Sequence, residues 1–394
     1  MSPRRLPPEL FSAFRPPPQT RYGTVTSIGQ GICTVQVAGG EIPVVTINGA
    51  PLNVGDFVAV QRQGVASYLL ASPSGAIWLP AAQNGGAGQY AWRVTSGGQQ
   101  SGYSLGDYYR FESPNVAATH PNGSVWIGGD DSSGNGAVWR IDPKAGTVTK
   151  GGTTFAGSVP YGLCVGPDDN IWASLGSPAQ TLAAFDPVTA APLGTVAIPS
   201  QIAVGQIITG PDGNLWIADV NLPGVWSYDL ATQTWRSVPL GASFPQGLYT
   251  YGSEIYVADN YGAVWVVTPP DGTAFYQLGS AYPYPVIDGY TATPEQIVVT
   301  STGVWMTDDS VRLLKFVIGV GTVSYFINIS PLPDMLGLCL GKDGNLWAVG
   351  SSGEGNTTVL AAWNQSGTVV DTILLEVPAG YPEPTIGYQI TAGP

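Results

Sequence analysis

The sequence predicts an all-β protein, a small barrel followed by a β-propeller, and its composition gives the first reason. Gly contributes 53 and Pro 34 of the 394 residues, and turn formers at this frequency keep regular segments short. The chain also contains 12 Trp, 19 Tyr and 10 Phe, which can fill an extensive core. Only 10% of the residues are charged, against about a quarter in typical soluble domains. This composition excludes helical bundles and coiled coils.

The second reason is a repeat that begins after residue 72. Five copies, SPSGAIWLPA, HPNGSVWIGG, GPDDNIWASL, GPDGNLWIAD and GKDGNLWAVG, are joined by two weaker ones, YGSEIYVADN and TSTGVWMTDD. Each copy carries an anchor aromatic, and these are Trp78, Trp126, Trp172, Trp216, Tyr256, Trp305 and Trp347. Their spacing of 40–49 residues is that of a four-stranded propeller blade. Residues 73–394 are therefore predicted to form a seven-bladed β-propeller whose anchor aromatics pack between neighbouring blades.

The ends of this repeat region predict how the ring closes. The first anchor, Trp78, has no inner strand before it, whereas the C-terminal EPTIGYQITAGP resembles the inner strand AVGQIITGP at 203–211. We expect the C-terminal segment to form the innermost strand of a blade whose other three strands come from 74–112. Closure by one strand plus three removes exposed sheet edges.

Residues 20–72 are predicted to form the small barrel. Alternating apolar segments lie between Gly-rich and Asn-Gly turns, at 24–28, 32–37, 42–47, 57–60 and 68–70. Five short strands in a segment of this length suit a small closed barrel such as an OB-fold. Basic residues are few and aromatic residues are scattered, so the segment is not expected to bind nucleic acid.

Residues 1–19 are predicted to form a Pro-rich basic arm. The stretches RLPP and RPPPQ favour extended polyproline conformation and cannot form a sheet. Arg4, Arg5, Arg15 and Arg21 are four of the 14 basic residues, whereas the whole chain carries a net charge of −13. This asymmetry indicates an arm that docks on another molecule, and a solvated tail is the alternative.

The candidate site residues come from aligning each inner strand with its anchor. This places Asn115, Tyr161, Gln246, Glu295 and Tyr388 at one mouth of the central channel. A second candidate is a Tyr-rich loop at 280–294 with Tyr282 and Tyr284, since tyrosines in loops suit recognition of carbohydrate or protein.

The same alignment gives no indication of catalysis. Only one of the channel-mouth residues is acidic, whereas Mg²⁺ and Ca²⁺ sites gather several oxygen ligands, so no metal and no cofactor are expected. The only histidine, His120, occupies a turn and is expected on the surface. The pair Asp130 and Asp131 is expected to be a pair of solvated loop acids. No P-loop is present, and the sequence predicts that the chain is not an enzyme.

Two resemblances to known families add to these inferences. The GPDGNLW repeats resemble virginiamycin B lyase-like propellers and, more loosely, the NHL and SMP-30/gluconolactonase-type propellers, although the lyase's catalytic histidine has no counterpart here. The pattern GTV…VGDxVxVxR at 23–62 resembles the OB-like domains of bacteriophage tail and baseplate proteins, especially minor tail proteins.

The second resemblance implies a structural and binding component of a phage tail, at or near the tail tip of the virion. Residues 1–72 would then attach to other tail proteins, and the chain would form part of a symmetric homo-oligomeric ring. The propeller would contact host envelope glycan or a neighbouring tail protein.

Two alternatives stay open, a metal-dependent lyase- or lactonase-type enzyme and a pure scaffold that does not bind the host. No membrane insertion is expected, because the most apolar run, 313–329, is interrupted by Lys315 and glycines and is rich in β-branched residues. The first residues also lack the apolar core of a secretory signal.

Overall fold

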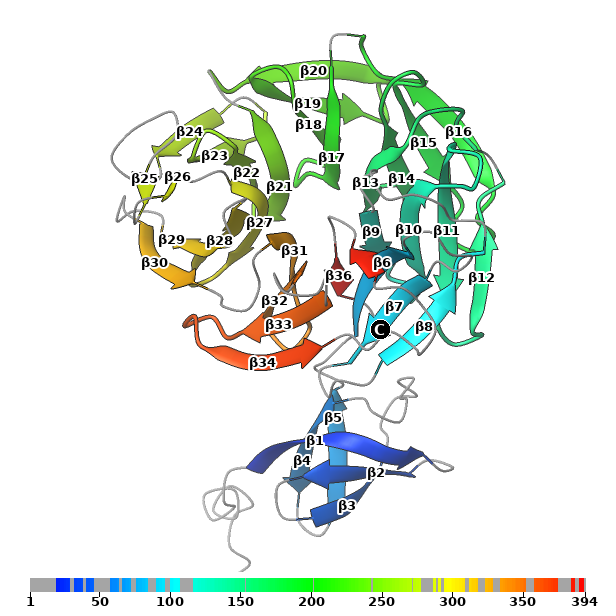
Figure 1. Cartoon of the computed structure of the whole chain (residues 1–394), viewed down its shortest axis with the longest axis vertical. Helices are drawn as coiled ribbons and strands as arrows, with labels where there is room; N and C mark the ends of the chain where they lie inside the picture. The colour runs from blue at the N-terminus through cyan, green and yellow to red at the C-terminus, as the bar shows by residue number, and fades with distance from the viewer. Residues whose placement is uncertain are drawn as a thin grey trace, which may run out of the picture. The chain divides into compact units, whose positions relative to one another are not determined.

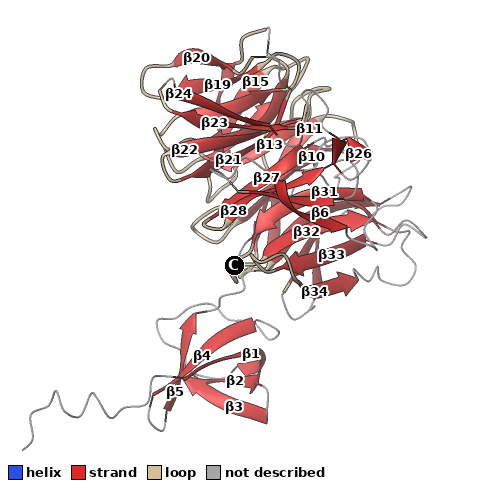
Figure 2. Ribbon diagram, turned by 90° about the vertical axis from the view of Figure 1, so that its left-hand side faces the viewer, coloured by secondary structure: helices blue, strands red, loops and turns tan. Residues whose placement is uncertain are grey.

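The chain consists of two compact units, residues 1–74 with 95–97, and residues 75–94 with 98–394. The computed structural model describes residues 19–28, 32–37, 40–45, 57–63, 66–71, 76–83, 90–95, 100–106, 116–152, 154–200, 202–241, 244–270, 272–277, 286–287, 290–291, 294–308, 312–317, 323–328, 334–351, 358–374, 384–386 and 390–392. These residues form strands, turns and loops without a helix (Figure 2). No described segment is therefore a helix that could cross a membrane. The predicted arm lies outside the described residues except for Gln19.

The first unit is a closed five-stranded barrel. Its strands are β1 (Gln19–Ile28), β2 (Ile32–Val37), β3 (Gly40–Val45), β4 (Phe57–Gln63) and β5 (Ala66–Ala71). They pair in the order β1-β2-β3-β5-β4, and β1 closes the barrel by pairing with both β2 and β4. All pairings are antiparallel except that of β3 with β5, which is parallel. Each of the five predicted strand segments overlaps one of these strands.

The second unit is a seven-bladed propeller, as predicted, with its sheets arranged in a ring (Figure 1). The inner strands are β9 (Val116–Thr119), β13 (Pro160–Val165), β17 (Val204–Thr209), β21 (Pro245–Tyr251), β27 (Pro294–Thr300), β31 (Asp334–Leu340), and β35 (Pro384–Ile386) with β36 (Thr391–Ala392). The second strands are β6 (Ile77–Gln83), β10 (Val125–Asp130), β14 (Ile171–Leu175), β18 (Leu215–Asp219), β22 (Glu254–Asp259), β28 (Gly303–Asp308) and β32 (Leu346–Ser351).

Two further strands complete each blade. The third strands are β7 (Tyr90–Val94), β11 (Gly136–Asp142), β15 (Thr181–Phe185), β19 (Gly224–Asp229), β23 (Ala263–Thr268), β29 (Arg312–Phe316) and β33 (Thr358–Trp363). The outer strands are β8 (Gln100–Ser104), β12 (Thr147–Lys150), β16 (Pro192–Ala197), β20 (Thr234–Pro239), β24 (Gly272–Gln277), β30 (Val323–Asn328) and β34 (Val369–Leu374). A separate two-stranded hairpin, β25 (Val286–Ile287) and β26 (Tyr290–Thr291), precedes β27.

The C-terminal strands close the ring, which confirms the one-plus-three prediction. Both β35 and β36 pair antiparallel with β6, so the last blade joins the C-terminus to β6, β7 and β8. Strand β36 also contacts its neighbours on either side, β31 and β9. The Thr119 and Thr391 hydroxyls are hydrogen-bonded at 3.1 Å across one of these junctions.

The predicted anchor aromatics pack between blades. All seven lie on second strands, and none is more than 6% exposed. Each belongs to a different one of seven core clusters, and each cluster combines side chains of two adjacent blades. Trp216, for example, packs against Leu248, Ile255 and Val257 of the next blade. The core is thus a ring of seven interfaces.

The aspartates of the PDG-type turns have a second role besides turn formation. The Trp216 indole Nε1 donates a hydrogen bond of 2.9 Å to Asp212 Oδ1. Trp172 makes the same contact with Asp168 at 2.9 Å, and Trp347 makes it with Asp343 at 3.2 Å. A buried indole N–H without a partner is costly, so these carboxylates satisfy the polar atom of the anchor.

His120 is buried, whereas the sequence predicted a position on the surface. Only 3% of this residue is exposed. Nδ1 accepts a hydrogen bond of 3.1 Å from the Asn122 backbone N–H, so Nε2 carries the hydrogen and donates to the Asp169 carbonyl oxygen at 2.9 Å. The histidine therefore links a turn of one blade to the corresponding turn of the next.

Candidate functional site: the cavity in the central channel

The inner strands surround a cavity of about 400 Å³. Every blade contributes to its wall: Ala117 from β9, Leu163 and Cys164 from β13, 206–209 from β17, 248–250 from β21, 296–298 from β27, 338–340 from β31, and 390–392 at β36. The volume lies within the range of about 300–1,000 Å³ typical of ligand sites. The cavity is therefore the central channel of the propeller, and it is large enough for a small ligand.

Glycines let the inner strands approach one another at this channel. A Cβ atom on Gly162 of β13 would lie 2.6 Å from the backbone nitrogen of Ile207 on β17. A Cβ atom on Gly247 of β21 would collide with the Glu295 carbonyl oxygen on β27. Real Cβ atoms do not approach backbone so closely, so any larger residue would force adjacent inner strands apart.

Hydrogen bonds between adjacent inner strands hold the wall together. The Thr209 hydroxyl donates to the Val165 carbonyl oxygen at 2.5 Å, and the Thr250 hydroxyl donates to the Thr209 carbonyl oxygen at 2.7 Å. Gln206 Oε1 accepts from the Leu248 backbone N–H at 2.6 Å. These bonds join β13, β17 and β21, and they leave the amide NH₂ of Gln206 available.

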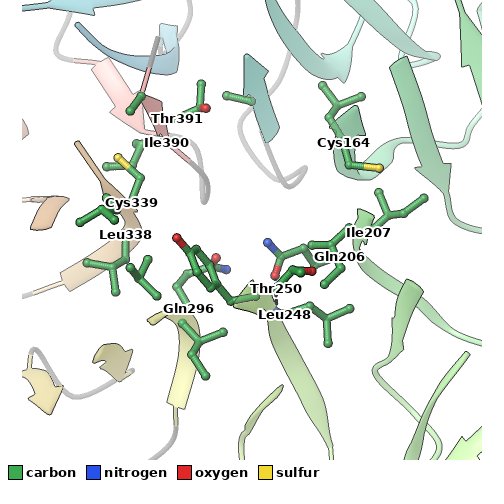
Figure 3. Close-up of a pocket in the computed structure, with 18 of the residues that line it drawn as sticks. Cys164, Gln206, Ile207, Leu248, Thr250, Gln296, Leu338, Cys339, Ile390 and Thr391 are labelled. Atoms are coloured by element: carbon green, nitrogen blue, oxygen red, sulfur yellow. Dashed lines mark hydrogen bonds between the residues drawn. The ribbon is translucent and has the colours of Figure 1, made fainter. Parts of the chain in front are cut away.

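The lining is uncharged and combines polar with apolar side chains. Of the described residues around the cavity, none is an acid, a base or a histidine. The hydrogen-bonding side chains include Gln206, Gln296, Tyr249, Thr250 and Thr391. Figure 3 shows the amides of Gln206 and Gln296 directed into the cavity from β17 and β27. Burial raises the pKa of Tyr249, so its phenol stays protonated and can both donate and accept.

Two free cysteines also lie in the wall, on opposite sides of the view in Figure 3. Cys164 and Cys339 are each 9% exposed and belong to the interblade core. Burial raises the pKa of the Cys164 thiol to about 12, and it raises that of Cys339 as well. Both are therefore thiols and not thiolates at neutral pH. The side chain of Cys33 is outside the described part of the structure.

The predicted channel-mouth residues precede the cavity wall in their strands. Tyr161, Gln246 and Glu295 lie near the starts of β13, β21 and β27, and none of the three lines the cavity. Tyr161 is 38% exposed and packs over Gly176. Asn115, Tyr388, Tyr282 and Tyr284 lie outside the described residues. Sequence analysis missed Gln206, Gln296 and Tyr249, although all three stand on segments that it assigned as inner strands.

Acidic side chains elsewhere form no metal centre among the described residues. Asp130 and Asp131 are 3% and 5% exposed, which corrects the expectation of solvated loop acids. Asp131 accepts hydrogen bonds from the Ser133 and Asn135 backbone N–H groups and pairs with Lys150 Nζ at 3.1 Å. Burial opposes its ionisation, but these contacts outweigh burial and lower its pKa. Asp131 thus has structural partners for its charge.

Comparison with known proteins supports the architecture. No family model matches the sequence, and no curated protein matches it significantly. Virginiamycin B lyase from Staphylococcus aureus has 14% identity and a TM-score of 0.53, covering 84% of this chain and 95% of that one. The periplasmic gluconolactonase of Pseudomonas aeruginosa has 15% identity and a TM-score of 0.56, covering 79% and 99%. The WD40 repeats of RRP9 have 10% identity and a TM-score of 0.53, covering 68% and 83%.

These comparisons contradict the expectation that the chain is not an enzyme. That expectation rested on the scarcity of acidic residues and histidine at the predicted channel mouth. Two of the proteins that share the fold are a lyase and a lactonase, so the architecture itself carries no argument against catalysis. At such low identities the likeness establishes the fold and not the reaction. The chain is a seven-bladed β-propeller that resembles the lyase and gluconolactonase propellers.

Proposed function

We propose that this protein is a structural and binding component of a bacteriophage tail, located in the virion at or near the tail tip, with a propeller that binds glycan of the host envelope. The observation that carries the proposal is a closed propeller with a hydrogen-bonding cavity at its centre, preceded in the chain by a separate small barrel. The cavity is suited to hold a ligand, and the barrel is suited to attach the propeller to an assembly.

The barrel supports attachment through its topology and its motif. We assign it to the OB type because five strands close in the order β1-β2-β3-β5-β4 with β3 and β5 parallel. The two halves of the pattern GTV…VGDxVxVxR fall on or beside β1 and β4, which pair with Thr24 opposite Phe57. The two halves of the motif that resembles phage tail proteins therefore lie on or beside two strands that pair with each other. In this proposal residues 1–72 bind other tail proteins and the chain forms a symmetric homo-oligomeric ring.

The residues at the starts of the inner strands are assigned a secondary role in this proposal. Tyr161, Gln246 and Glu295 would contribute to a contact with a neighbouring tail protein. Tyr161 supports this, because an exposed tyrosine presents an apolar face together with a polar tip at low entropic cost.

Immunogold electron microscopy tests the assignment directly. Antibody raised against the whole chain would be applied to virus particles whose genome encodes it. Label at one end of the tail is expected. Unlabelled particles, with the protein found free in the lysate, would overturn the virion assignment.

A second candidate function is a metal-dependent lyase- or lactonase-type reaction, the class of activity named for two proteins that share the fold. A metal that binds only the folded state must raise the melting temperature. This candidate therefore predicts stabilisation by Mg²⁺ or Ca²⁺ and destabilisation by EDTA. A pure scaffold, the remaining alternative, predicts label on the tail and no binding to host cells.

A further inference from the structure

The geometry of the central cavity points to its ligand: we infer that it binds one or two terminal sugars of an uncharged glycan. This inference rests on the proposed function and assigns the site and the substrate class within it.

Charge excludes ionic ligands from the cavity. None of the described lining residues carries a charge, so no cation is present to receive a carboxylate, sulfate or phosphate. The chain as a whole has a net charge of −13, and its field repels anions at a distance. A cationic ligand would likewise find no carboxylate in the described wall. An ion transferred there would lose its hydration without a charged partner.

Hydrogen bonding excludes a purely apolar ligand. Gln296 uses its backbone N–H to bond Thr307 Oγ1 at 3.2 Å, but within the described structure its side-chain amide contacts no protein partner. The Tyr249 hydroxyl likewise has no hydrogen-bond partner among the described residues. Burying these groups against hydrocarbon would leave them unsatisfied. Sugar hydroxyls both donate and accept, as the amides, hydroxyls and phenol of this wall do.

Strand β21 carries one tyrosine in the cavity wall and a second, exposed tyrosine beyond it. Tyr249 lines the cavity, and Tyr251 follows two residues later on the same face of the strand. Tyr251 is 41% exposed. An aromatic ring presents a flat apolar face that suits the C–H face of a sugar ring, beside a hydroxyl that can hydrogen-bond. A glycan with its terminal sugars in the cavity can therefore extend outward along Tyr251.

The variants that test this site are chosen to spare the fold. Gln296→Leu and Tyr249→Phe remove groups that make no hydrogen bond within the described structure, whereas Gln206→Leu would also release the Leu248 N–H. Asn221→Ala is the matched control, since it removes an exposed side-chain amide that does not line the cavity and makes no hydrogen bond within the described structure. Unchanged thermal unfolding of each variant verifies that the ring is intact.

The whole chain, fluorescently labelled, would first be applied to an array of neutral and acidic oligosaccharides. The best-bound oligosaccharide would then be titrated calorimetrically into each variant. We expect the bound oligosaccharides to be neutral, Gln296→Leu to weaken binding about tenfold, Tyr249→Phe to weaken it about threefold, and Asn221→Ala to leave it unchanged.

Three outcomes would overturn the inference: no bound oligosaccharide, bound oligosaccharides that are all acidic, or an affinity that Gln296→Leu does not change. A loss on Gln246→Leu without a loss on Gln296→Leu would move the site to the starts of the inner strands, and it too would refute the cavity assignment. The result is independent of the virion test. Labelled tails without glycan binding would refute the cavity site and the proposed glycan binding but not the virion assignment. Glycan binding by a protein absent from particles would refute the virion assignment but not the cavity site.

Discussion

Ring closure by the C-terminus should make Ile390 one of the most sensitive positions in the propeller. Ile390 is 6% exposed and packs with Ile77, Leu79 and Val349 in the interface between the last two blades. Its methyl group also contacts the position of Gly337 on β31. Truncation of a buried isoleucine to alanine costs about 2–5 kcal/mol. Ile390 borders the cavity on one side, so we expect the lower part of this range, about 2–3 kcal/mol.

The assay is equilibrium unfolding in urea, followed by tryptophan fluorescence, because the anchor indoles lie at the blade interfaces. For a slope of about 3 kcal/mol per molar urea, Ile390→Ala should lower the midpoint by roughly 0.7–1 M. The control is Val370→Ala on outer strand β34, where the side chain is 48% exposed and the cost should stay within about 0.5 kcal/mol. A chain ending at Pro378 lacks β35 and β36 altogether and should lose its cooperative transition. Equal midpoints for the two alanine variants, or a normal transition in the truncated chain, would refute closure by this segment.

Three further predictions concern turns and thiols. Asp212→Ala removes the acceptor of the buried Trp216 indole N–H and should lower the unfolding free energy by about 1–3 kcal/mol. Asp212→Asn keeps an acceptor and should cost less. Equal losses for the two variants in urea titrations would contradict the role of Asp212 as the acceptor for this indole. The hydrogen bond from the Thr189 backbone N–H lowers the pKa of Asp186 in the folded protein. Such a carboxylate stabilises the folded state at pH values above its pKa in the unfolded chain, and this stabilisation is lost as the pH falls through its pKa in the folded protein. The melting temperature should therefore fall below about pH 4, less steeply in Asp186→Asn, and parallel curves would exclude this contribution. Cys164, whose pKa burial raises to about 12, should resist iodoacetamide at pH 8 and react fully in urea; alkylation of its peptide in the folded protein, detected by mass spectrometry, would show that the thiol is accessible.

The number and closure of the blades could be predicted because their determinants are local and repeated. Each anchor aromatic stands a few residues after a turn with Asp-Gly, Asn-Gly or a related pair, and such turns fix the register of a hairpin. Trp216 and Trp347 occur in nearly identical contexts, so the period is readable without any tertiary information. The inner-strand character of the C-terminus follows from its likeness to 203–211.

The residues of the cavity could not be predicted, because the inner strands are interrupted by register shifts. Pairing of β13 with β14 shifts between Pro160 and Gly162, and the corresponding shifts occur at 204–207, 245–248, 294–297 and 335–337. Such a shift re-aims every side chain on one side of it. Tyr161, Gln246 and Glu295 fall inside these shifts, and so do the cavity residues Gln206 and Gln296. Neighbouring residues of one shift therefore differ in whether they line the cavity. An alignment counted from the anchors cannot detect this change.

His120 shows a second limit of sequence reasoning, which is contact between repeats. Within its own repeat the residue is a turn histidine, and turns are usually solvated. Its partner, Asp169, stands 49 residues away in the next repeat. The arrangement of the blades in a ring brings the two turns together. The burial of His120 between them follows from this tertiary contact and not from its own repeat.

The same C-terminal residues close the ring and line the cavity, so stability and ligand binding must be coupled. Ile390, Thr391 and Ala392 belong to the cavity wall, and Thr391 and Ala392 pair with Trp78 and Ile77 of β6. If the strand detaches, the cavity loses one of its seven sides, and a ligand that needs all of them cannot bind. A ligand in the cavity must then oppose detachment, raising stability by an amount set by its concentration relative to its dissociation constant, about 2.7 kcal/mol at a hundredfold excess. The C-terminal strand thus connects the mechanical integrity of the propeller with occupation of its channel.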